Sequence, residues 1–309
     1  MITTVTLNVA IDKLYIVDEY KPYEVMRVQK CTYTPGGKGL NVTKVASLLQ
    51  EEVTATGFVG GHAGEWILEA LDKLGIKHQF VKGNNETRTC INIKELSTGR
   101  HTEFLEPGAP LTEEDEKVFL EVFERTIEKS KVVTISGSIP GGVSKDIYCK
   151  LVAICKKAGK KVLVDTSGEL LTGVIEAKPT MIKPNIDELQ AITKQDIHSI
   201  DDVIRVAKGL KDKGIEIVAV SLGKDGVLVL CEEGIYHGMP PSIEPINTVG
   251  CGDSMIAGFA VGLSREYSIS DTIKMAVAVS AANALTNDTG YFKEEDYNEL
   301  LNRVTINKL

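Results

Sequence analysis

From about residue 130 onward the chain repeats one pattern, in which a short β-branched apolar run ends in small or polar residues and a helical pattern follows. Strands alternating with helices predict an α/β fold with a parallel sheet. In such sheets ligands bind beyond the carboxyl ends of the strands, so the polar strand ends mark the edge where we expect a site. These ends are Thr134–Ser138, Leu163–Ser167, Met181–Asn185 and Val218–Gly223.

The helices of this region are expected where apolar residues recur with helical spacing. Thr112 with Asp115 forms a candidate cap for the first of them. The expected ranges are Thr112–Glu128, Ser144–Ala158, Ile200–Lys213 and Ser270–Leu285.

The N-terminal third behaves differently, because its strands are not each followed by a helix that continues the main sheet. We expect a separate small sheet, a lid built from insertions at about residues 10–35 and 87–107 of one domain that spans residues 1–309. Helices at Leu40–Leu49 and Glu65–Leu74 would return the chain to the main sheet. The expected lid strands are Lys13–Val17, Arg27–Thr34, Arg88–Lys94 and His101–Leu105.

Composition excludes several classes of function. A net charge of -8, without basic clusters interleaved with aromatics, argues against nucleic-acid binding. No apolar run reaches the length of a membrane span, and no segment reads as a secretion signal, so we expect a cytoplasmic enzyme. The six cysteines form no C-x-x-C pair, which argues against a disulfide framework or a zinc site.

The segment Asn247–Phe259 places a glycine-rich turn and one carboxylate at the start of an apolar helix. Gly250 and Gly252 let the backbone approach an anion closely, and the first N–H groups of the helix point at it. Asp253 would sit where a base is useful. The alternative is an ordinary helix start with an acidic first turn. Cys251 also allows two interpretations. It is either a thiol whose pKa is lowered by the helix N-terminus or a small hydrophobe that points into the core.

A second glycine-rich helix start is Pro35–Val42, in which Gly36 and Gly37 precede Lys38. It does not match the G-x-x-x-x-G-K-[ST] phosphate loop, and no dinucleotide-binding fingerprint is present. Backbone N–H groups and Lys38 could bind hydroxyls or a phosphate of a small ligand. The alternative is a simple turn with a solvated lysine.

Asn185 and Glu188 follow a predicted strand and open a helix, three residues apart. Both side chains can therefore face one hydrated Mg²⁺ ion, which takes few protein ligands. The alternative is a capping box between the same two residues. Ser221–Gly226 is a further turn at a strand end and by itself indicates only a β-turn.

Together these segments, in this order along essentially the whole chain, resemble the ribokinase-like sugar kinases of the PfkB family. That family implies a doubly wound, mostly parallel sheet with a small β-sheet lid. Within it, the chain is most similar to the ketohexose-phosphate branch of 1-phosphofructokinases, tagatose-6-phosphate kinases and one type of 6-phosphofructokinase. The segments are Thr6–Asp12, Gly36–Asn41, Ser136–Pro140, Lys183–Pro184–Asn185 with Glu188, Ser221–Gly226 and Gly250–Asp253.

The resemblance assigns roles at matching positions. Asp253 would be the catalytic base, with N–H groups of Gly250, Cys251 and Gly252 meeting the transferring phosphoryl group. Sugar hydroxyls would be held by Asp12, Gly37 and Asn41. The phosphate already on the sugar would be met by Lys38, Arg88, Ser138 and Arg27. ATP would lie along Lys183, Asn185, Ser221, Gly223 and Gly226, with Asn283 near the adenine. Mg²⁺ would be organised by Asn185 and Glu188.

Two positions depart from the branch: Val9 stands where Pro is usual, which loosens the loop that carries Asp12, and Cys251 replaces a small residue. The resemblance implies an ATP-dependent kinase that converts fructose 1-phosphate to fructose 1,6-bisphosphate, acting as a homodimer joined through the lid. Tagatose 6-phosphate is the alternative substrate, favoured by Thr87–Ile93 and Thr289–Tyr291. A catalytically idle sugar-phosphate sensor is the alternative of another class, although binding alone does not require Asp253. Lys38 and Arg88 disfavour a free-sugar or nucleoside kinase.

Overall fold

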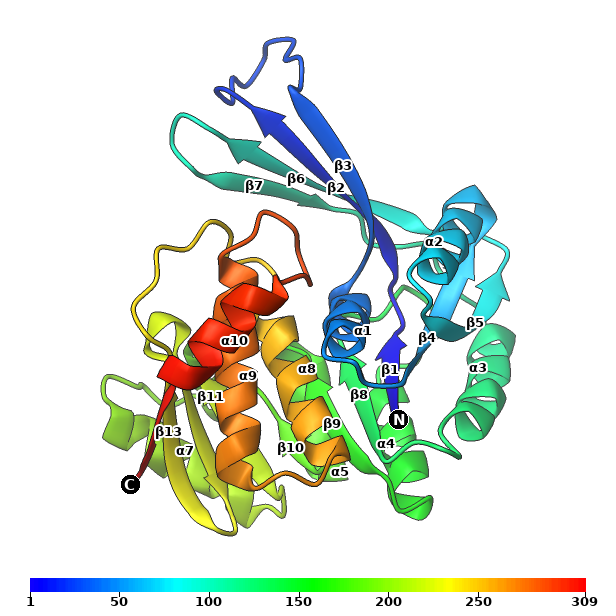
Figure 1. The fold of residues 1–309 in the computed structure, drawn as a ribbon. Helices are drawn as coiled ribbons and strands as arrows, with labels where there is room; N and C mark the ends of the chain where they lie inside the picture. The colour runs from blue at the N-terminus through cyan, green and yellow to red at the C-terminus, as the bar shows by residue number, and fades with distance from the viewer.

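The computed structural model describes all residues, 1–309, as an α/β fold with one large sheet and one small one (Figure 1). The ten strands of the large sheet lie in the order β14-β13-β12-β11-β10-β9-β8-β1-β4-β5. Neighbours from β5 through β11 are parallel, and β12, β13 and β14 add an antiparallel edge. The strands are β1 (Ile2–Thr6), β4 (Val53–Gly60), β5 (Lys77–Gly83), β8 (Val132–Ser136), β9 (Lys161–Asp165), β10 (Met181–Ile182), β11 (Ile217–Ser221), β12 (Val227–Cys231), β13 (Gly234–Met239) and β14 (Thr305–Lys308).

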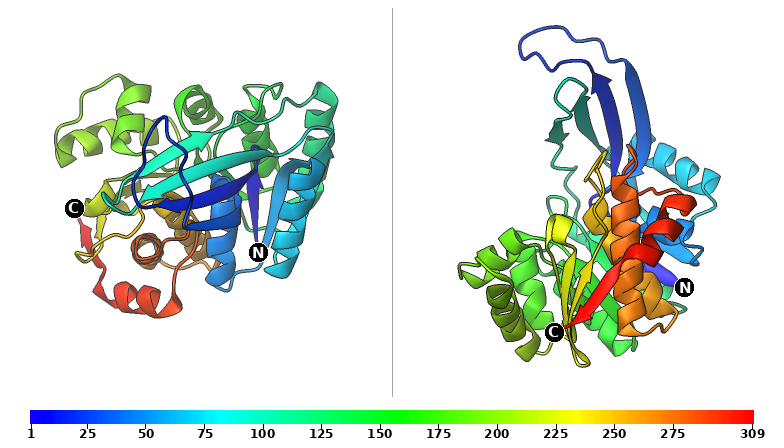
Figure 2. Two further views of the ribbon diagram at one scale, coloured as in Figure 1. Left: turned by 90° about the horizontal axis from the view of Figure 1, so that it is seen from above. Right: turned by 60° about the vertical axis from the view of Figure 1, so that its left-hand side comes forward.

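Helices cover both faces of this sheet, as the edge-on view in the right panel of Figure 2 shows. Each face has its own core of fully buried apolar side chains, which confirms the doubly wound arrangement. One face carries α1 (Lys38–Leu48), α2 (Gly61–Lys73), α8 (Cys251–Ser264), α9 (Ile269–Ala284) and α10 (Glu294–Arg303). The other carries α3 (Glu113–Thr126), α4 (Ile147–Lys157), α5 (Gly168–Ala177), α6 (Ile186–Thr193) and α7 (Ile200–Asp212).

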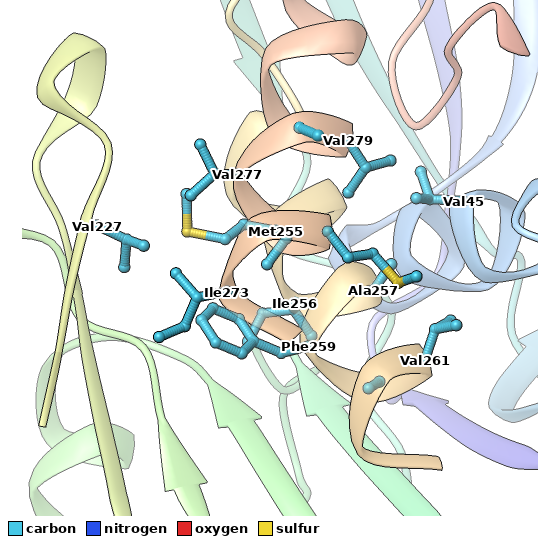
Figure 3. Close-up of a cluster of buried hydrophobic side chains, with 14 of the residues drawn as sticks. Val45, Val227, Met255, Ile256, Ala257, Phe259, Val261, Ile273, Val277 and Val279 are labelled. Atoms are coloured by element: carbon cyan, nitrogen blue, oxygen red, sulfur yellow. The ribbon is translucent and has the colours of Figure 1, made fainter. Parts of the chain in front are cut away.

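Helix α8, the helix that follows the Gly250 turn, is buried along almost its whole length. Ile256 and Phe259 pack in the core beside Ile273 of α9 (Figure 3). The two helices approach so closely that a Cβ at Gly258 would lie 2.5 Å from the Cα of Ala276, and glycine makes this approach possible. This packing fixes the N-terminus of α8 firmly relative to the sheet.

The small sheet stands above the carboxyl ends of the parallel strands (Figure 1). We call it the lid sheet. It has the order β3-β2-β6-β7, with β2 and β6 parallel and the outer pairs antiparallel. Its strands are β2 (Ala10–Val17), β3 (Lys30–Gly36), β6 (Arg88–Glu95) and β7 (His101–Leu105).

Two predicted strand boundaries shift by several residues. Strand β2 begins at Ala10 rather than Lys13, because Ala10 pairs with Gly36 at the base of the lid sheet. Strand β3 begins at Lys30, so Arg27 lies in the loop before it and not in a strand.

None of the helices combines the length and the apolar character that a membrane crossing demands.

Candidate active site

A cavity of about 500 Å³ lies between the lid sheet and the carboxyl edge of the large sheet. Only five of its 29 lining residues are hydrophobic, so it suits a polar ligand. Many of the residues singled out in the sequence meet here although they come from distant segments. They are Asp12, Gly37, Lys38, Asn41, Arg88, Ser138, Gly250, Gly252 and Asp253.

The Gly250 turn starts α8 directly at the cavity wall. Gly250 has a φ of 81°, and a Cβ there would lie 2.7 Å from Cγ2 of Thr289, so the position requires glycine. Gly250 and Gly252 line the cavity, and a helix N-terminus favours a negative charge at that point. The N–H of Cys251, also assigned to the transferring group from the sequence, donates to the carbonyl oxygen of Thr248 at 3.3 Å instead.

Asp253 lies in the first turn of α8 and is only 6% exposed. Its Oδ2 accepts a 2.8 Å hydrogen bond from Nδ2 of Asn41. Burial raises the pKa of Asp253 to about 6, although the nearby Lys38 ammonium opposes the shift. A carboxylate with a pKa just below neutrality can accept a proton at physiological pH, which is what a general base must do.

Two lysines converge on a second buried carboxylate near Asp253. Asp165, at the end of β9, is 1% exposed and lies 3.5 Å from Nζ of Lys38 and 3.4 Å from Nζ of Lys183. Burial alone would raise the pKa of Asp165, but the two ammonium groups lower it below its ordinary value. Asp165 in turn raises the pKa of Lys38. Asp165 therefore favours the charged form of Lys38 at the site.

Lys183 reaches the Gly250 turn as well. A Cβ at Gly252 would lie 3.3 Å from its Nζ, so glycine leaves room for the ammonium group next to the first N–H groups of α8. Sequence reasoning assigned Lys183 and Lys38 separately and missed Asp165. Its only sequence signal was its place at the polar end of the Leu163–Ser167 strand, facing the expected site edge.

Asp12 extends from the lid sheet into the opposite side of the cavity. Glycine is required at position 36, because a Cβ there would lie 2.0 Å from Cγ of Asp12. Burial raises the pKa of Asp12, and Lys44 and Arg88 oppose this effect. Gly37, with a φ of 99°, passes the chain from β3 into α1, which brings Lys38 and Asn41 beside Asp12.

Arg88 is firmly held at the base of the lid sheet. Its Nε and one terminal nitrogen donate to the carbonyl oxygen of Asn8 at 3.2 and 2.9 Å, and the other donates to that of Glu106 at 2.7 Å. Nδ2 of Asn8 also donates to Oγ of Ser138 at 3.1 Å. Arg88 and Ser138 thus share one hydrogen-bonded unit at the cavity wall.

Asn185 and Glu188 form a capping box at the start of α6. Oδ1 of Asn185 accepts from N of Glu188 at 2.8 Å, and Oε2 of Glu188 accepts from N of Asn185 at 3.0 Å. No group of three or more His, Cys, Asp or Glu residues in the chain is arranged to hold a metal ion. Oxygen donors that leave most of the coordination to water still suit Mg²⁺, with Oε1 of Glu188 as the oxygen outside the box.

The remaining predicted residues lie outside the cavity lining. Ser221 bridges to Asn185 at the adjoining strand ends, and Gly223 and Gly226 form the tight turn that follows. Arg27 lies on the exposed loop between β2 and β3.

Asn283 is fully buried, and the structure gives it bracing contacts around the Gly250 turn. Its Nδ2 donates to the carbonyl oxygen of Val249 at 3.0 Å. Its Oδ1 accepts from Oγ of Ser254 and from N of Gly290. These hydrogen bonds use both polar atoms of the Asn283 side chain within the protein.

The structure favours the second interpretation of Cys251, a small hydrophobe, over an activated thiol. Burial raises the pKa of this thiol to about 11, and the neighbouring Asp253 carboxylate adds to the shift. The side chain packs inward, where Sγ lies 3.6 Å from Nδ2 of Asn283. Burial therefore outweighs the N-terminus of α8, and the alternative of a small hydrophobe describes the residue better.

Comparison with known proteins agrees with this geometry. A model of the family described as pfkB family carbohydrate kinase matches residues 5–296. The chain belongs to this family. It is therefore a phosphotransferase that acts on carbohydrates, and the predicted family and enzyme class are confirmed.

Solved structures of other proteins superpose over nearly the whole chain. Phosphofructokinase-2 from Escherichia coli, in complex with potassium, is 29% identical and has a TM-score of 0.92, with 98% of each chain covered. The same enzyme in complex with fructose 6-phosphate is 28% identical, with a TM-score of 0.91 and 98% of each chain covered. A protein from Thermotoga maritima described as a possible 1-phosphofructokinase is 29% identical, with a TM-score of 0.91 over 100% of this chain and 99% of that one.

Proposed function

We propose that this carbohydrate kinase transfers a phosphoryl group from ATP to a ketohexose phosphate, with fructose 1-phosphate to fructose 1,6-bisphosphate as the leading reaction. The observation that carries the proposal is a buried base, Asp253, beside an anion-binding helix start in a cavity that also presents Lys38 and Arg88. Support for the substrate class comes from its relatives: the Escherichia coli enzyme binds fructose 6-phosphate and the Thermotoga maritima protein is described as a possible 1-phosphofructokinase.

In this proposal Asp253 takes the proton from the sugar hydroxyl that attacks the γ-phosphorus. The N–H groups of Gly250 and Gly252 meet the negative charge of the transferring group. Lys183 adds a positive charge beside them, since it lies against Gly252. Phosphoryl transfer depends mainly on positioning and charge stabilisation, and this set of groups supplies both.

The sugar phosphate would lie between the lid sheet and α1. Asp12, Gly37 and Asn41 would hold its hydroxyls, and Lys38, Arg88 and Ser138 would meet its phosphate. Arg88 retains free N–H donors after its bonds to the backbone. Arg27 could join them only from outside the cavity of a single chain.

ATP would extend from the Gly250 turn past Lys183 and Asn185 toward Ser221, Gly223 and Gly226. Mg²⁺ would be held largely through water by Glu188 and Asn185, where it would neutralise phosphate charge. The oxygen of Glu188 that lies outside the capping box supports this assignment. Asn283 would influence the adenine site only indirectly, through the Gly250 turn that its side chain braces.

We also propose a homodimer joined through the lid sheets, in a protein that acts in the cytoplasm. Tyr23 and Val25 on the β2–β3 loop are almost completely exposed, and Phe104 and Leu105 of the edge strand β7 are more than half exposed. Apolar side chains gathered on a projecting sheet with unpaired edges are expected to be covered by another protein surface.

The substrate assignment is tested by measuring ATP consumption with fructose 1-phosphate, fructose 6-phosphate, tagatose 6-phosphate and the unphosphorylated sugars. We expect the highest kcat/KM for fructose 1-phosphate. A higher value for tagatose 6-phosphate would favour the alternative kinase, and a preference for free sugars would contradict the proposed roles of Lys38 and Arg88. Absence of turnover with measurable sugar-phosphate binding would indicate a sensor.

The catalytic assignment is tested by Asp253→Asn. We expect kcat to fall by several orders of magnitude while ATP affinity stays within a few-fold, because the amide keeps the shape but accepts no proton. Arg88→Ala serves as the comparison, since it should raise KM for the sugar phosphate far more than KM for ATP. An Asp253→Asn enzyme that kept more than a tenth of the wild-type kcat would not be using this residue as its base.

A further inference from the structure

Lys44, on the inner side of α1, has no role in the proposed reaction. It is one turn after Asn41, the residue that bonds Asp253. Its Nζ donates a 2.9 Å hydrogen bond to the carbonyl oxygen of Thr289. Partial burial of an ammonium group costs free energy, and this hydrogen bond offsets part of that cost.

The partner segment, residues 286–291 between α9 and α10, packs against both sides of the site. We call it the 286–291 loop. A Cβ at Gly290 would lie 2.9 Å from the Cα of Asn41 and 3.0 Å from Cε of Lys44. On its other side, Thr289 limits the space at Gly250 to a glycine. Lys44 thus connects the helix that holds Asn41 with the turn that starts α8.

Charge converges on the same lysine. Burial lowers the pKa of Lys44, and three carboxylates, those of Asp12, Asp253 and Asp288, oppose this by favouring the ammonium form. Lys44 is also the charge that most favours ionisation of Asp12 against the effect of burial. The other charges that face Asp12 are Arg88 and Glu103, and those that face Asp253 are Lys38, Asp165 and Lys183.

We propose that Lys44 is a positioning residue of the kinase reaction: its ammonium group holds the 286–291 loop against the Gly250 turn and places a positive charge beside Asp12 and Asp253. The inference rests on the proposed roles of Asp12 and Asp253. It assigns Lys44 no contact with either substrate. Lys44 acts through the carboxylates and the loop that surround it.

Lys44→Gln tests the charge, because glutamine can still donate to the carbonyl oxygen of Thr289 but carries no positive charge. Removing a cation raises the pKa of nearby carboxyl groups. We therefore expect kcat/KM for the sugar phosphate to fall roughly tenfold at pH 6 and the loss to shrink as the pH rises to 8. KM for ATP should change less than threefold. Lys44→Arg keeps the charge and should keep the wild-type pH profile.

Lys160→Gln is the matched control. Nζ of Lys160 also donates to a backbone carbonyl, that of Glu128 at 2.6 Å, but it lies just before β9, at the opposite edge of the sheet from the cavity. This variant should leave the kinetics unchanged at every pH. Thermal unfolding of each variant checks that the chain folds.

Three results would overturn the inference: an acid limb of Lys44→Gln that coincides with the wild type, a loss that is equal at all pH values, or a folded Lys44→Arg enzyme with a shifted acid limb. The last keeps the test decisive even if the neutral variant does not fold. An active Asp253→Asn enzyme would instead contradict the proposed function. An inactive one beside an unshifted Lys44→Gln profile would contradict only the role of Lys44.

Discussion

Asp253 is placed where its chemistry and its contribution to stability conflict. A carboxyl group whose pKa is higher in the folded chain binds its proton more tightly there. The cost of ionising it therefore appears as pH rises from about 4 to about 6 and is fully present above that range. At neutral pH the folded protein carries this cost, which accompanies the role of base that we propose for Asp253.

Asp253→Asn should accordingly stabilise the protein at pH 8, by about 3 kcal/mol at most, since the shift is about two pKa units. At pH 4 the wild type and the variant should unfold at the same denaturant midpoint, because the carboxyl is then neutral in the native state. Urea unfolding at the two pH values measures the difference. A gain that is equal at both would show that ionisation of Asp253 is not its cause.

Cys251 gives a second prediction at this scale. With its pKa raised to about 11, the thiol is almost entirely protonated at pH 7.5, and only the thiolate reacts. We expect iodoacetamide to modify Cys251 at least roughly a hundredfold more slowly in the native protein than in the unfolded chain. Peptide mass spectrometry gives the two rates. Comparable rates would restore the interpretation of an activated thiol at the helix N-terminus.

Single residues were predictable where one short segment contains the whole requirement. The Gly250 turn and Asp253 are adjacent in the chain, so their motif was visible. The roles of Asp165 and Lys44 were not predictable, since each depends on charged side chains that other elements supply. Asp165 needs Lys38 and Lys183, which meet in the fold but lie far apart in the sequence, and no spacing rule relates them.

The capping boxes of α3 and α6 can be compared to distinguish a structural role from a functional one. Thr112 and Asp115 form the first, as the sequence predicted, and it lies away from the cavity. Asn185 and Glu188 form the second, at the proposed metal site. Both boxes satisfy the first N–H groups of a helix in the same way.

Asp115→Ala and Glu188→Ala should therefore each lower the free energy of unfolding by about 1 kcal/mol. Only Glu188→Ala should also raise the magnesium concentration needed for half the maximal rate, because it alone removes a carboxylate from the proposed magnesium site. Kinetics over a magnesium titration measure this. If the two variants have the same magnesium dependence, Glu188 is a helix cap and nothing more.

Element boundaries were predictable where the signal is local and failed where it is not. Helix α2 begins at Gly61, ahead of the expected Glu65, because the carboxylate of Glu86 accepts from N of His62 and N of Ala63. A cap supplied from more than twenty residues away leaves no mark in the segment itself. The antiparallel edge of β12, β13 and β14 was missed for a similar reason, since no signal along the chain assigns its strands to the large sheet.

At the scale of the whole molecule, the apolar surface of the lid sheet leads to a test of the homodimer. We expect sedimentation at micromolar concentration with substrate to give a dimer. Val25→Lys should shift it toward monomer, because a charge would be placed in the proposed interface. Leu74→Lys, at an exposed apolar residue after α2, is the control and should sediment as the wild type does. A wild-type monomer would contradict the proposed contact.

The bonds of Arg88 have a mechanical consequence. The chain crosses between the large sheet and the lid sheet four times, and Arg88 starts one of the lid strands that follow these crossings. Its side chain also joins two of the crossings, because it donates to the carbonyl oxygens of Asn8, between β1 and β2, and of Glu106, just after β7. Any rotation of the lid sheet must therefore turn about an axis close to Arg88. Displacement is smallest beside the residues proposed to bind the sugar and grows with distance to the outer loop. A small force applied at the tip, for instance by a second subunit, would therefore act through a long lever arm and produce a larger force at the cavity.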